Sequence, residues 1–422
     1  MNRGNQRDFY QKIFEKCEPN LVIQTVEKTQ GSQKGDNYTS VLDSVVLKGT
    51  IKAPTDTTAP SEWKKSVFCK RLPESEARRE TYKSVGLFHN EIAFYKNIYP
   101  EFQAFQREHG VRDDDAFTAL PKCFYAEDNV LVLEDMRETG YRMQDRKEGL
   151  SVEQIKLVLI ELAKFHALNL AMKFKEPERF RLQKEQISEG IFRREHKHWY
   201  ENYYGALTSN AIGMVCDGLP ERPKYINKVK DFCKNFFEDF TNLLACETPL
   251  SVLCHGDCWT NNLLFSYTPT GELHRTAFID FQLMRYGSLT LDLAYALYLS
   301  VPYQVRRTHK MDLIRFYYDN LVRQLCLYGP LPQELQSRDH LWELIQQDLQ
   351  RFSKFSLYVG MDMIPIMTCD SEEAPDVYEE EDETTQDDVH VTQAPELGIP
   401  VNDLCRLTMV ELVVELVDDG LL

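Results

Sequence analysis

The eleven residues His255-Gly-Asp-Cys-Trp-Thr-Asn-Asn-Leu-Leu-Phe265 form the most informative segment of this 422-residue chain. Within the segment, Asp257 is followed five residues later by Asn262, in a tight loop after a short apolar run. A carboxylate and an amide at this spacing can divide two tasks. The Asp receives or orients a hydroxyl proton, and the Asn oxygen ligates Mg²⁺. Because His and Gly directly before the Asp make a chance match rare, the segment predicts a phosphoryl-transfer loop.

A second acidic residue, Asp280, follows Phe265 after a turn at Pro269-Thr-Gly271 and a short apolar strand. A carboxylate at this strand end projects toward the same loop and can hold the metal of a nucleotide. Such an Asp is commonly only a turn cap, but its position after the His255 segment favours the metal role. We interpret Asp292, further along, as a structural anchor below the site.

Upstream residues can supply the phosphate contacts. Lys70 lies in the apolar run Val67-Phe-Cys-Lys70, where an ammonium group needs a counterion. Glu91, on the following apolar-faced helix, is the candidate counterion. The loop Gly31–Ser40 contains two glycines and can cradle phosphates through backbone N–H groups. The alternatives are a snorkelling lysine, a solvated glutamate and a plain turn.

The charge of the chain is strongly uneven. The sequence has 49 Lys and Arg against 66 Asp and Glu, a net charge of −17. Residues 370–388 contain eleven acidic residues and no basic one, which leaves −6 for the rest. We expect an acidic, disordered insertion at 370–396. The acidic balance argues against nucleic-acid binding, which draws on clustered Lys and Arg.

Cysteine usage and hydropathy predict a cytoplasmic protein. The eleven cysteines are odd in number and scattered, without a CxxC pair, which favours reduced thiols over a disulfide framework. Cys254 and Cys258 flank His255 and Asp257, but buried free thiols are a better interpretation than a zinc site. The N-terminus lacks the apolar stretch of a secretory signal, and no run is long enough to cross a bilayer.

Hydrophobic periodicity divides the chain into two parts. Strand-like runs at 41–47, 66–72 and 130–133 surround one helical stretch at 76–99. From Ser151, which begins a capping-box signature, the pattern is helical, with only 252–254 and 277–281 resembling strands. The sequence predicts an α+β, bilobal fold: a small β-rich N-lobe with one main helix and a large, mostly helical C-lobe. Its expected limits are 1–133 for the N-lobe, 134–137 for a hinge and 138–422 for the C-lobe.

Eight motifs together resemble the ecdysteroid kinase-like (CHK kinase-like) family of arthropods. They are GDNYTS, FCKRLP, FHNEIAFY, LVLEDM, LAKFHAL, HGDCWTNNLLF, IDFQ and DLAYAL. That family belongs with the aminoglycoside and choline phosphotransferases of the protein-kinase-like fold. The resemblance covers nearly the whole chain from about residue 20, and it does not identify a substrate.

The resemblance implies ATP and Mg²⁺ as cofactors and a role for each matching residue. Asp257 would be the catalytic base, Asn262 and Asp280 the magnesium ligands, and His255 a structural member of the loop. The cofactor-binding residues would be Lys70 with its partner Glu91, Gly35 and Asn37 in the first loop, and Glu134 and Met136 in a hinge that holds adenine through backbone groups.

The predicted acceptor is a small hydroxylated molecule. Phe-Gln rather than Phe-Gly follows Asp280, and a helix begins within about a dozen residues, leaving no room for the activation segment of a protein kinase. Dense aromatic residues in the second half favour a lipophilic substrate such as an ecdysteroid or a xenobiotic, implying steroid hormone metabolism or detoxification. Most of these rings could equally be core. The rings are Trp199, Tyr200, Tyr203, Tyr204, Phe236, Phe237, Tyr295, Tyr298 and Tyr303.

Three alternatives stay open at this point. The chain could be a catalytically silent small-molecule-binding pseudokinase, although all five polar site positions are intact. It could be a choline/ethanolamine-type or other amino-alcohol kinase. A protein kinase is disfavoured by the missing activation segment. The sequence gives no prediction of the oligomeric state.

Overall fold

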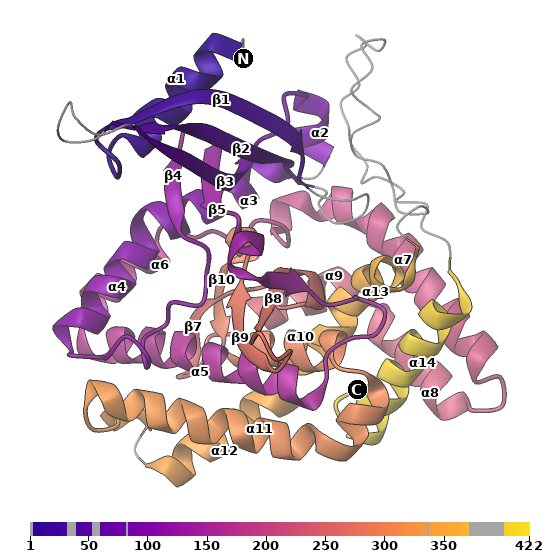
Figure 1. Cartoon of the computed structure of the whole chain (residues 1–422). Coiled ribbons are helices and arrows are strands. Elements are labelled where there is room, and N and C mark those ends of the chain that lie inside the picture. The colour runs from indigo at the N-terminus through magenta and orange to yellow at the C-terminus, as the bar shows by residue number, and fades with distance from the viewer. Residues whose placement is uncertain (1–2, 32–38, 53–59, 82, 336, 371–400) are drawn as a thin grey trace.

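The computed structural model describes residues 3–31, 39–52, 60–81, 83–335, 337–370 and 401–422 (Figure 1). The predicted nucleotide-loop residues Gly35 and Asn37 lie outside these ranges, as does nearly all of the predicted acidic insertion. Within the described ranges, no helix combines the length and apolar composition that a membrane crossing requires.

The N-terminal part is built on an antiparallel sheet of five strands in the order β1-β2-β3-β5-β4. Helix α1 (Arg3–Phe14) packs its buried Tyr10, Ile13 and Phe14 against this sheet. The sequence prediction of three strands was incomplete, because β1 and β4 lie partly exposed and carry weak patterns. The strands are β1 (Leu21–Gln30), β2 (Val41–Ile51), β3 (Ser61–Arg71), β4 (Cys123–Glu127) and β5 (Val130–Glu134).

The stretch predicted as one helix at 76–99 is helical, but it is broken near Lys83, and the helical path then continues through a π turn beyond residue 99. Lys83 adopts a left-handed conformation with φ of +49°, which separates the first two segments. A π-helical turn and a proline near the start of the last segment continue the chain into α4. The segments are α2 (Glu76–Thr81), α3 (Ser84–Ala93), the π turn (Phe94–Ile98) and α4 (Tyr99–Glu108).

The C-terminal part is mostly helical and follows a 3₁₀ turn at Met136–Thr139. Its long helix α5 begins with the predicted capping box: Ser151 accepts a hydrogen bond from the Gln154 backbone, and the Gln154 side chain accepts one from the Ser151 backbone. The helices are α5 (Val152–Lys175), α6 (Pro177–Lys184), α7 (Lys197–Gly218), α8 (Pro223–Cys233), α9 (Phe236–Leu244), α10 (Thr290–Ser300), α11 (Tyr303–Leu325), α12 (Arg338–Phe352), α13 (Phe355–Thr368) and α14 (Asp403–Asp418).

Two small sheets carry the loops of the site. One pairs β7 with β10, and the other has the order β6-β8-β9. The expectation of only two strands in this half was wrong, because the strands are short and two of their pairings, β6 with β8 and β7 with β10, join segments distant in sequence. The strands are β6 (Tyr141–Met143), β7 (Ser251–Cys254), β8 (Leu263–Tyr267), β9 (Leu273–Phe278) and β10 (Arg285–Ser288).

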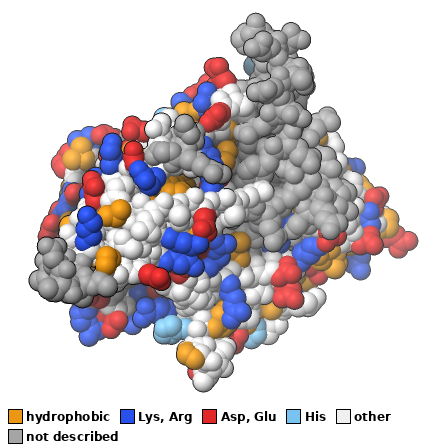
Figure 2. Space-filling model, turned by 45° about the horizontal axis from the view of Figure 1, so that its top comes forward, with side chains coloured by type: hydrophobic (Ala, Val, Ile, Leu, Met, Phe, Trp, Pro, Cys, Tyr) orange, Lys and Arg blue, Asp and Glu red, His pale blue; other side chains and the backbone are white. Residues whose placement is uncertain are grey.

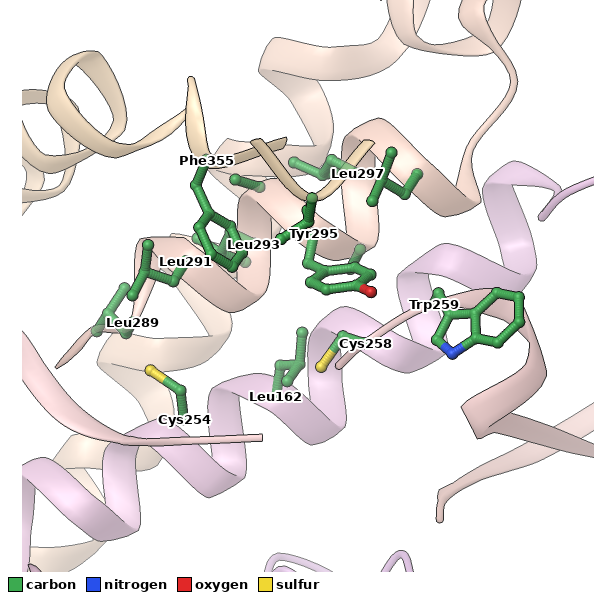
Figure 3. Close-up of a cluster of buried hydrophobic side chains, with 14 of the residues drawn as sticks. Leu162, Cys254, Cys258, Trp259, Leu289, Leu291, Leu293, Tyr295, Leu297 and Phe355 are labelled. Atoms are coloured by element: carbon green, nitrogen blue, oxygen red, sulfur yellow. The ribbon is translucent and has the colours of Figure 1, made fainter. Parts of the chain in front are cut away.

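The core of the C-terminal part lies between α5, α10 and the strands that carry the loops. Figure 3 shows Leu291, Leu293 and Leu297 of α10 near Leu162 of α5 and Cys254 at the end of β7. None of the eleven cysteines forms a disulfide. This packing gives the loops after β7 and β9 a rigid base.

The C-terminal helix is tied into the same unit. Glu415 of α14 accepts a hydrogen bond from the Arg306 guanidinium at 2.7 Å and one from the Lys310 ammonium at 2.8 Å. In Figure 1, α14 lies beside α7, α8 and α13, and each of these helices packs against it. On the face seen in Figure 2, acidic and basic side chains are interspersed over the described surface.

Candidate active site

The predicted catalytic loop folds around a direct contact between its two polar residues. Asn262 donates its side-chain amide to Asp257 Oδ2 at 2.7 Å and to the Asp257 carbonyl at 3.0 Å. The other carboxylate oxygen, Oδ1, is buried and has no hydrogen-bond partner among the described residues. Burial raises the pKa of Asp257 to about 7, and the nearby Tyr295 hydroxyl and the hydrogen bond from Asn262 partly oppose this shift. The loop thus holds one oxygen in place and leaves the other free to accept a proton.

A buried network below the loop fixes its backbone. Asp292 is fully buried and accepts the backbone N–H groups of His255 and Gly256, each at 2.8 Å. His166 Nε2 donates to the same carboxylate at 3.1 Å. Although burial raises its pKa, the hydrogen bond from His166 helps to hold the pKa of Asp292 below the usual range. The geometry agrees with the structural role that the sequence predicted for Asp292.

His255 joins the catalytic loop to the segment that carries Asp280. Its Nε2 donates to the Ile279 carbonyl at 3.1 Å, and its Nδ1 accepts the Asp257 backbone N–H at 3.2 Å. Burial lowers the pKa of this imidazole, so it is neutral at pH 7. Its contacts are therefore those of a positioning residue.

Lys70 and Glu91 meet as predicted, and the lysine also reaches Asp280. Lys70 Nζ lies 2.6 Å from Glu91 Oε2 and 2.7 Å from Asp280 Oδ1. Burial lowers the pKa of Lys70, but the charges of Asp280 and Glu91 outweigh it and raise the pKa overall. The ammonium group is therefore charged and held between the N-terminal sheet and the loop after β9.

Asp280 itself is placed differently from the prediction. Strand β9 ends at Phe278, so Asp280 lies two residues beyond the strand, with φ of +67°. A left-handed conformation is uncommon for a residue with a side chain and is often found at functional sites. This turn directs the backbone into the 3₁₀ turn Phe281–Leu283.

The donor set beside the loop suits a magnesium ion, which prefers oxygen ligands. Because Asn262 uses its N–H₂ group on Asp257, its amide oxygen is left without a described donor. Asp280 contributes a carboxylate whose side chain is 20% exposed, and both residues line the same cavity. The residues present therefore fit the group that the sequence implied.

A cavity of about 190 Å³ brings these residues together. Asp257, Asn262 and Asp280 lie on its wall with five of the nine nominated aromatic residues: Trp199, Tyr200, Tyr203, Tyr204 and Tyr295. The other four do not line it. Phe236 and Phe237, for example, are buried behind the wall, where Phe236 stacks on Tyr204 with ring centroids 4.7 Å apart. Figure 3 shows Tyr295 on α10 near Trp259 of the catalytic loop.

The hinge residues lie elsewhere. Glu134 ends β5 and pairs with Val67 of β3, while Met136 is buried at the start of the 3₁₀ turn. Neither lines the cavity. Their predicted contact with adenine stays a prediction.

Sequence reasoning missed several residues of the cavity wall. Asp362 of α13 and Arg285 of β10 both line the cavity. Arg285 Nε lies 3.4 Å from Glu189 Oε2, and the guanidinium packs over the Phe192 ring. Neither residue lies in a recognisable sequence motif. The sequence of α13 has the pattern of an apolar helix, and that of β10 has the pattern of a short turn. The only available signal was a single acidic residue in the apolar stretch Met361–Met367.

The glutamine that replaces the usual glycine after Asp280-Phe also has a contact. The Thr39 hydroxyl donates to Gln282 Oε1 at 2.7 Å, and both residues line the cavity. Thr39 closes the predicted phosphate loop, so this bond connects that loop with the segment of Asp280.

Together the sheet with its buried Lys70–Glu91 pair and the loop of Asp257 facing Asp280 define a protein-kinase-like fold of the small-molecule phosphotransferase type. The model of the ecdysteroid kinase-like family matches residues 34–329, well over half of the chain. The protein belongs to the ecdysteroid kinase-like family.

A curated relative is an uncharacterized oxidoreductase, dhs-27, of Caenorhabditis elegans. It is 22% identical in an alignment 325 residues long, and the match covers 71% of this chain and 36% of that protein. The chain therefore spans about a third of the length of this relative. The likeness does not transfer the activity in that name.

Two solved kinases resemble the chain in fold. An ethanolamine kinase of Plasmodium vivax has 12% identity and a TM-score of 0.42, with 98% of this chain and 88% of that chain covered. The choline kinase LicA of Streptococcus pneumoniae has 14% identity and a TM-score of 0.32, with 83% of this chain and 99% of that chain covered. At this distance the likeness carries no argument about substrate.

Proposed function

We propose that the protein is a kinase that transfers the γ-phosphoryl group of ATP, with Mg²⁺, to a hydroxyl group of a small lipophilic acceptor. Ecdysteroids, the namesake substrates of the family, and hydroxylated xenobiotics are the acceptor classes this proposal names. The observation that carries it is the meeting of Asp257, Asn262 and Asp280 on one partly aromatic cavity, with Lys70 beside them.

Each residue would contribute through position and charge. Asp257, whose Oδ1 is free, would accept the proton of the acceptor hydroxyl. Asn262 and Asp280 would hold the magnesium ion, which neutralises developing phosphate charge when bound. Lys70, kept charged and oriented by Glu91, would bind phosphate oxygens. This division needs no covalent intermediate, because phosphoryl transfer depends mainly on positioning and electrostatic stabilisation.

The proposal also places the nucleotide between two lobes, 1–133 and 138–422, with 134–137 as the hinge. Glu134 and Met136 would then present backbone groups to adenine, and Gly35 and Asn37 would approach the phosphates. We further propose a cytoplasmic location, which the eleven cysteines outside disulfides support, because thiols stay reduced in such compartments.

Lys70→Met tests the nucleotide part of the proposal. Methionine keeps much of the aliphatic length but removes the ammonium, so we expect the affinity for Mg²⁺-ATP to fall by at least tenfold. Thermal shift on titrating Mg²⁺-ATP measures this loss. Lys48→Met, an exposed change on neighbouring β2, is the matched control and should leave the shift intact.

Consumption of ATP in the presence of hydroxylated steroids, lipophilic alcohols and amino alcohols tests the acceptor part. Mass spectrometry of the product locates the phosphate. If the wild type binds no Mg²⁺-ATP at all, the proposal is overturned in favour of a silent binding protein; if it labels only peptides, it is a protein kinase.

A further inference from the structure

An acidic side chain that the proposed phosphoryl transfer does not use faces the acceptor cavity. Asp362 lies on α13, in the wall of the cavity, and is half-buried. The Tyr203 hydroxyl donates a hydrogen bond to its Oδ1. Its Oδ2 accepts no hydrogen bond from the described residues. The second oxygen is therefore available to a molecule inside the cavity.

The surroundings of Asp362 are aromatic and supply no counterion. Tyr200, Tyr203 and Tyr204 from α7 and Tyr295 from α10 line the same cavity. The basic side chain of the wall, Arg285, has its ion pair with Glu189 and packs on Phe192. Among the described residues, no cation lies within salt-bridge distance of Asp362.

The other two carboxylates of the wall have tasks in the proposed phosphoryl transfer. Asp280 pairs with the Lys70 ammonium, whereas Asp257 receives a hydrogen bond from the neutral Asn262 amide on Oδ2 and is proposed to face the acceptor hydroxyl with Oδ1. Burial raises the pKa of Asp362 to about 6, so this carboxylate is still mainly ionised at pH 7. A negative charge on a largely aromatic wall is costly without a cation. Because Asp257 is assigned to the acceptor hydroxyl, Asp362 is the wall carboxylate that is left without a cation and without a task.

We propose that the acceptor carries a positively charged amino group, which Asp362 binds while the rings of Tyr200, Tyr203, Tyr204 and Tyr295 surround it and the acceptor hydroxyl faces Asp257. This assignment rests on the proposed phosphotransferase function. Within the acceptor classes named there, it selects lipophilic amino alcohols and disfavours ecdysteroids, which carry no amino group. Asp362 and the four tyrosines would thus determine which acceptor binds, and Asp257 would accept the proton of its hydroxyl.

Two arguments favour a cation over a neutral hydroxyl. A hydroxyl would donate a hydrogen bond to Asp362 but leave its charge without a counterion. An ammonium group donates the hydrogen bond and also supplies the counterion. Aromatic faces also attract a cation through their quadrupoles, which a neutral group does not exploit. A cavity of about 190 Å³ accommodates a compact head group more readily than a fused-ring skeleton, because sites for drug-sized ligands span roughly 300–1,000 Å³.

A matched pair of acceptors tests the charge alone. 2-(Dimethylamino)ethanol is protonated at pH 7.5, and 3-methylbutan-1-ol has the same shape without the charge. We expect the wild type to show at least a tenfold higher kcat/KM for the amine. Asp362→Asn should raise KM for the amine by at least tenfold with little change in kcat. For the neutral alcohol, the same variant should change KM by less than about threefold.

Tyr203→Phe is the companion variant, because it keeps the ring and removes only the hydroxyl that donates to Asp362. It should retain the preference for the amine. Asp362→Asn should unfold at no lower temperature than the wild type at pH 8, since it removes a carboxylate that burial disfavours in its charged form. If the unfolding temperature of Asp362→Asn still rises on addition of Mg²⁺-ATP, the variant has kept the nucleotide site. A loss of amine binding is then distinguished from a loss of the kinase site.

The pH dependence gives an independent readout. As pH falls through about 6, Asp362 takes up a proton and KM for the amine should rise, while the Asp362→Asn profile stays flat. The tyrosines of the wall do not titrate in this range, because burial raises the pKa of Tyr200, Tyr203, Tyr204 and Tyr295 well above 10. Asp257 does titrate, since its pKa is about 7, and its protonation should lower kcat in the wild type and in Asp362→Asn alike. The Arg285 guanidinium in the same wall stays charged throughout.

The outcomes separate the two proposals. Equal kcat/KM for the two acceptors, or an equal loss on both in Asp362→Asn, overturns the amine assignment while the kinase function stands. If no acceptor is phosphorylated, titration of 2-(dimethylamino)ethanol by calorimetry decides: binding that Asp362→Asn abolishes supports the amine site, and absence of binding overturns it. Failure of Mg²⁺-ATP binding contradicts only the proposed kinase function.

Discussion

Asp257→Asn should lower kcat for phosphoryl transfer by about a thousandfold, within the range that general-base catalysis contributes. The variant keeps the size of the side chain and an oxygen that can accept the Asn262 amide, so the loop should keep its fold. It loses the carboxylate oxygen Oδ1, which has no other partner and is the group free to take a proton. Initial rates with any acceptor that the wild type uses measure the effect.

Binding of Mg²⁺-ATP serves as the internal control, because the thermal shift should persist in Asp257→Asn. Asp231→Asn, an exposed change on α8, should leave both rate and binding unaltered. A variant at Asp257 that keeps more than about a tenth of the wild-type kcat would show that another group accepts the proton.

Gly256→Ala should both destabilise the protein and disable the site. Gly256 has φ of +85°, and a Cβ atom there would lie 1.9 Å from the Leu283 carbonyl oxygen. Because that oxygen belongs to the backbone after Asp280, the methyl group must push the catalytic loop away from the metal segment. We expect the free energy of unfolding to fall by roughly 2–5 kcal/mol, from left-handed strain and overpacking together.

Gly271→Ala is a close control, since Gly271 has the same φ of +85° but open space around its Cβ position. It lies in the turn between β8 and β9 and should cost only about 1–2 kcal/mol of strain. Chemical denaturation of both variants separates strain from collision. Equal stability of the two would refute the close approach of the two loops.

The backbone features that were predictable from the sequence depend on neighbours within a few residues. The capping box at Ser151, the turn at Pro269–Gly271 and the helix soon after Asp280 are of this kind. Features that depend on distant partners were missed. Strand β10 is only four residues long and is a strand because it pairs with β7. The break at Lys83, where φ is +49°, was also missed, since the local pattern alone favours a continuous helix.

In the candidate site, the identity of the motif residues could be predicted from the sequence, whereas the contacts between them are made by the fold. The sequence by itself determined which side chains were nominated for the proposed chemistry, because Asp257 and Asn262 share one short loop and Asp280 follows it after a single hairpin. Lys70 and Glu91 were nominated for the same reason of local pattern, and their contact was confirmed.

Only the tertiary structure decided what surrounds the acceptor. Asp362 lies 105 residues after Asp257 in an apolar helix, and nothing in its neighbourhood distinguishes it from a solvated acid until α7, α10 and α13 pack together. The same packing sorts Tyr203 into the cavity wall and Phe237 into the core, although both are aromatic residues on helices. The residues of the proposed catalytic chemistry can thus be recognised from their local spacing in the sequence. Specificity arises from which faces of distant helices meet, since burial and pairing are properties of the assembled wall.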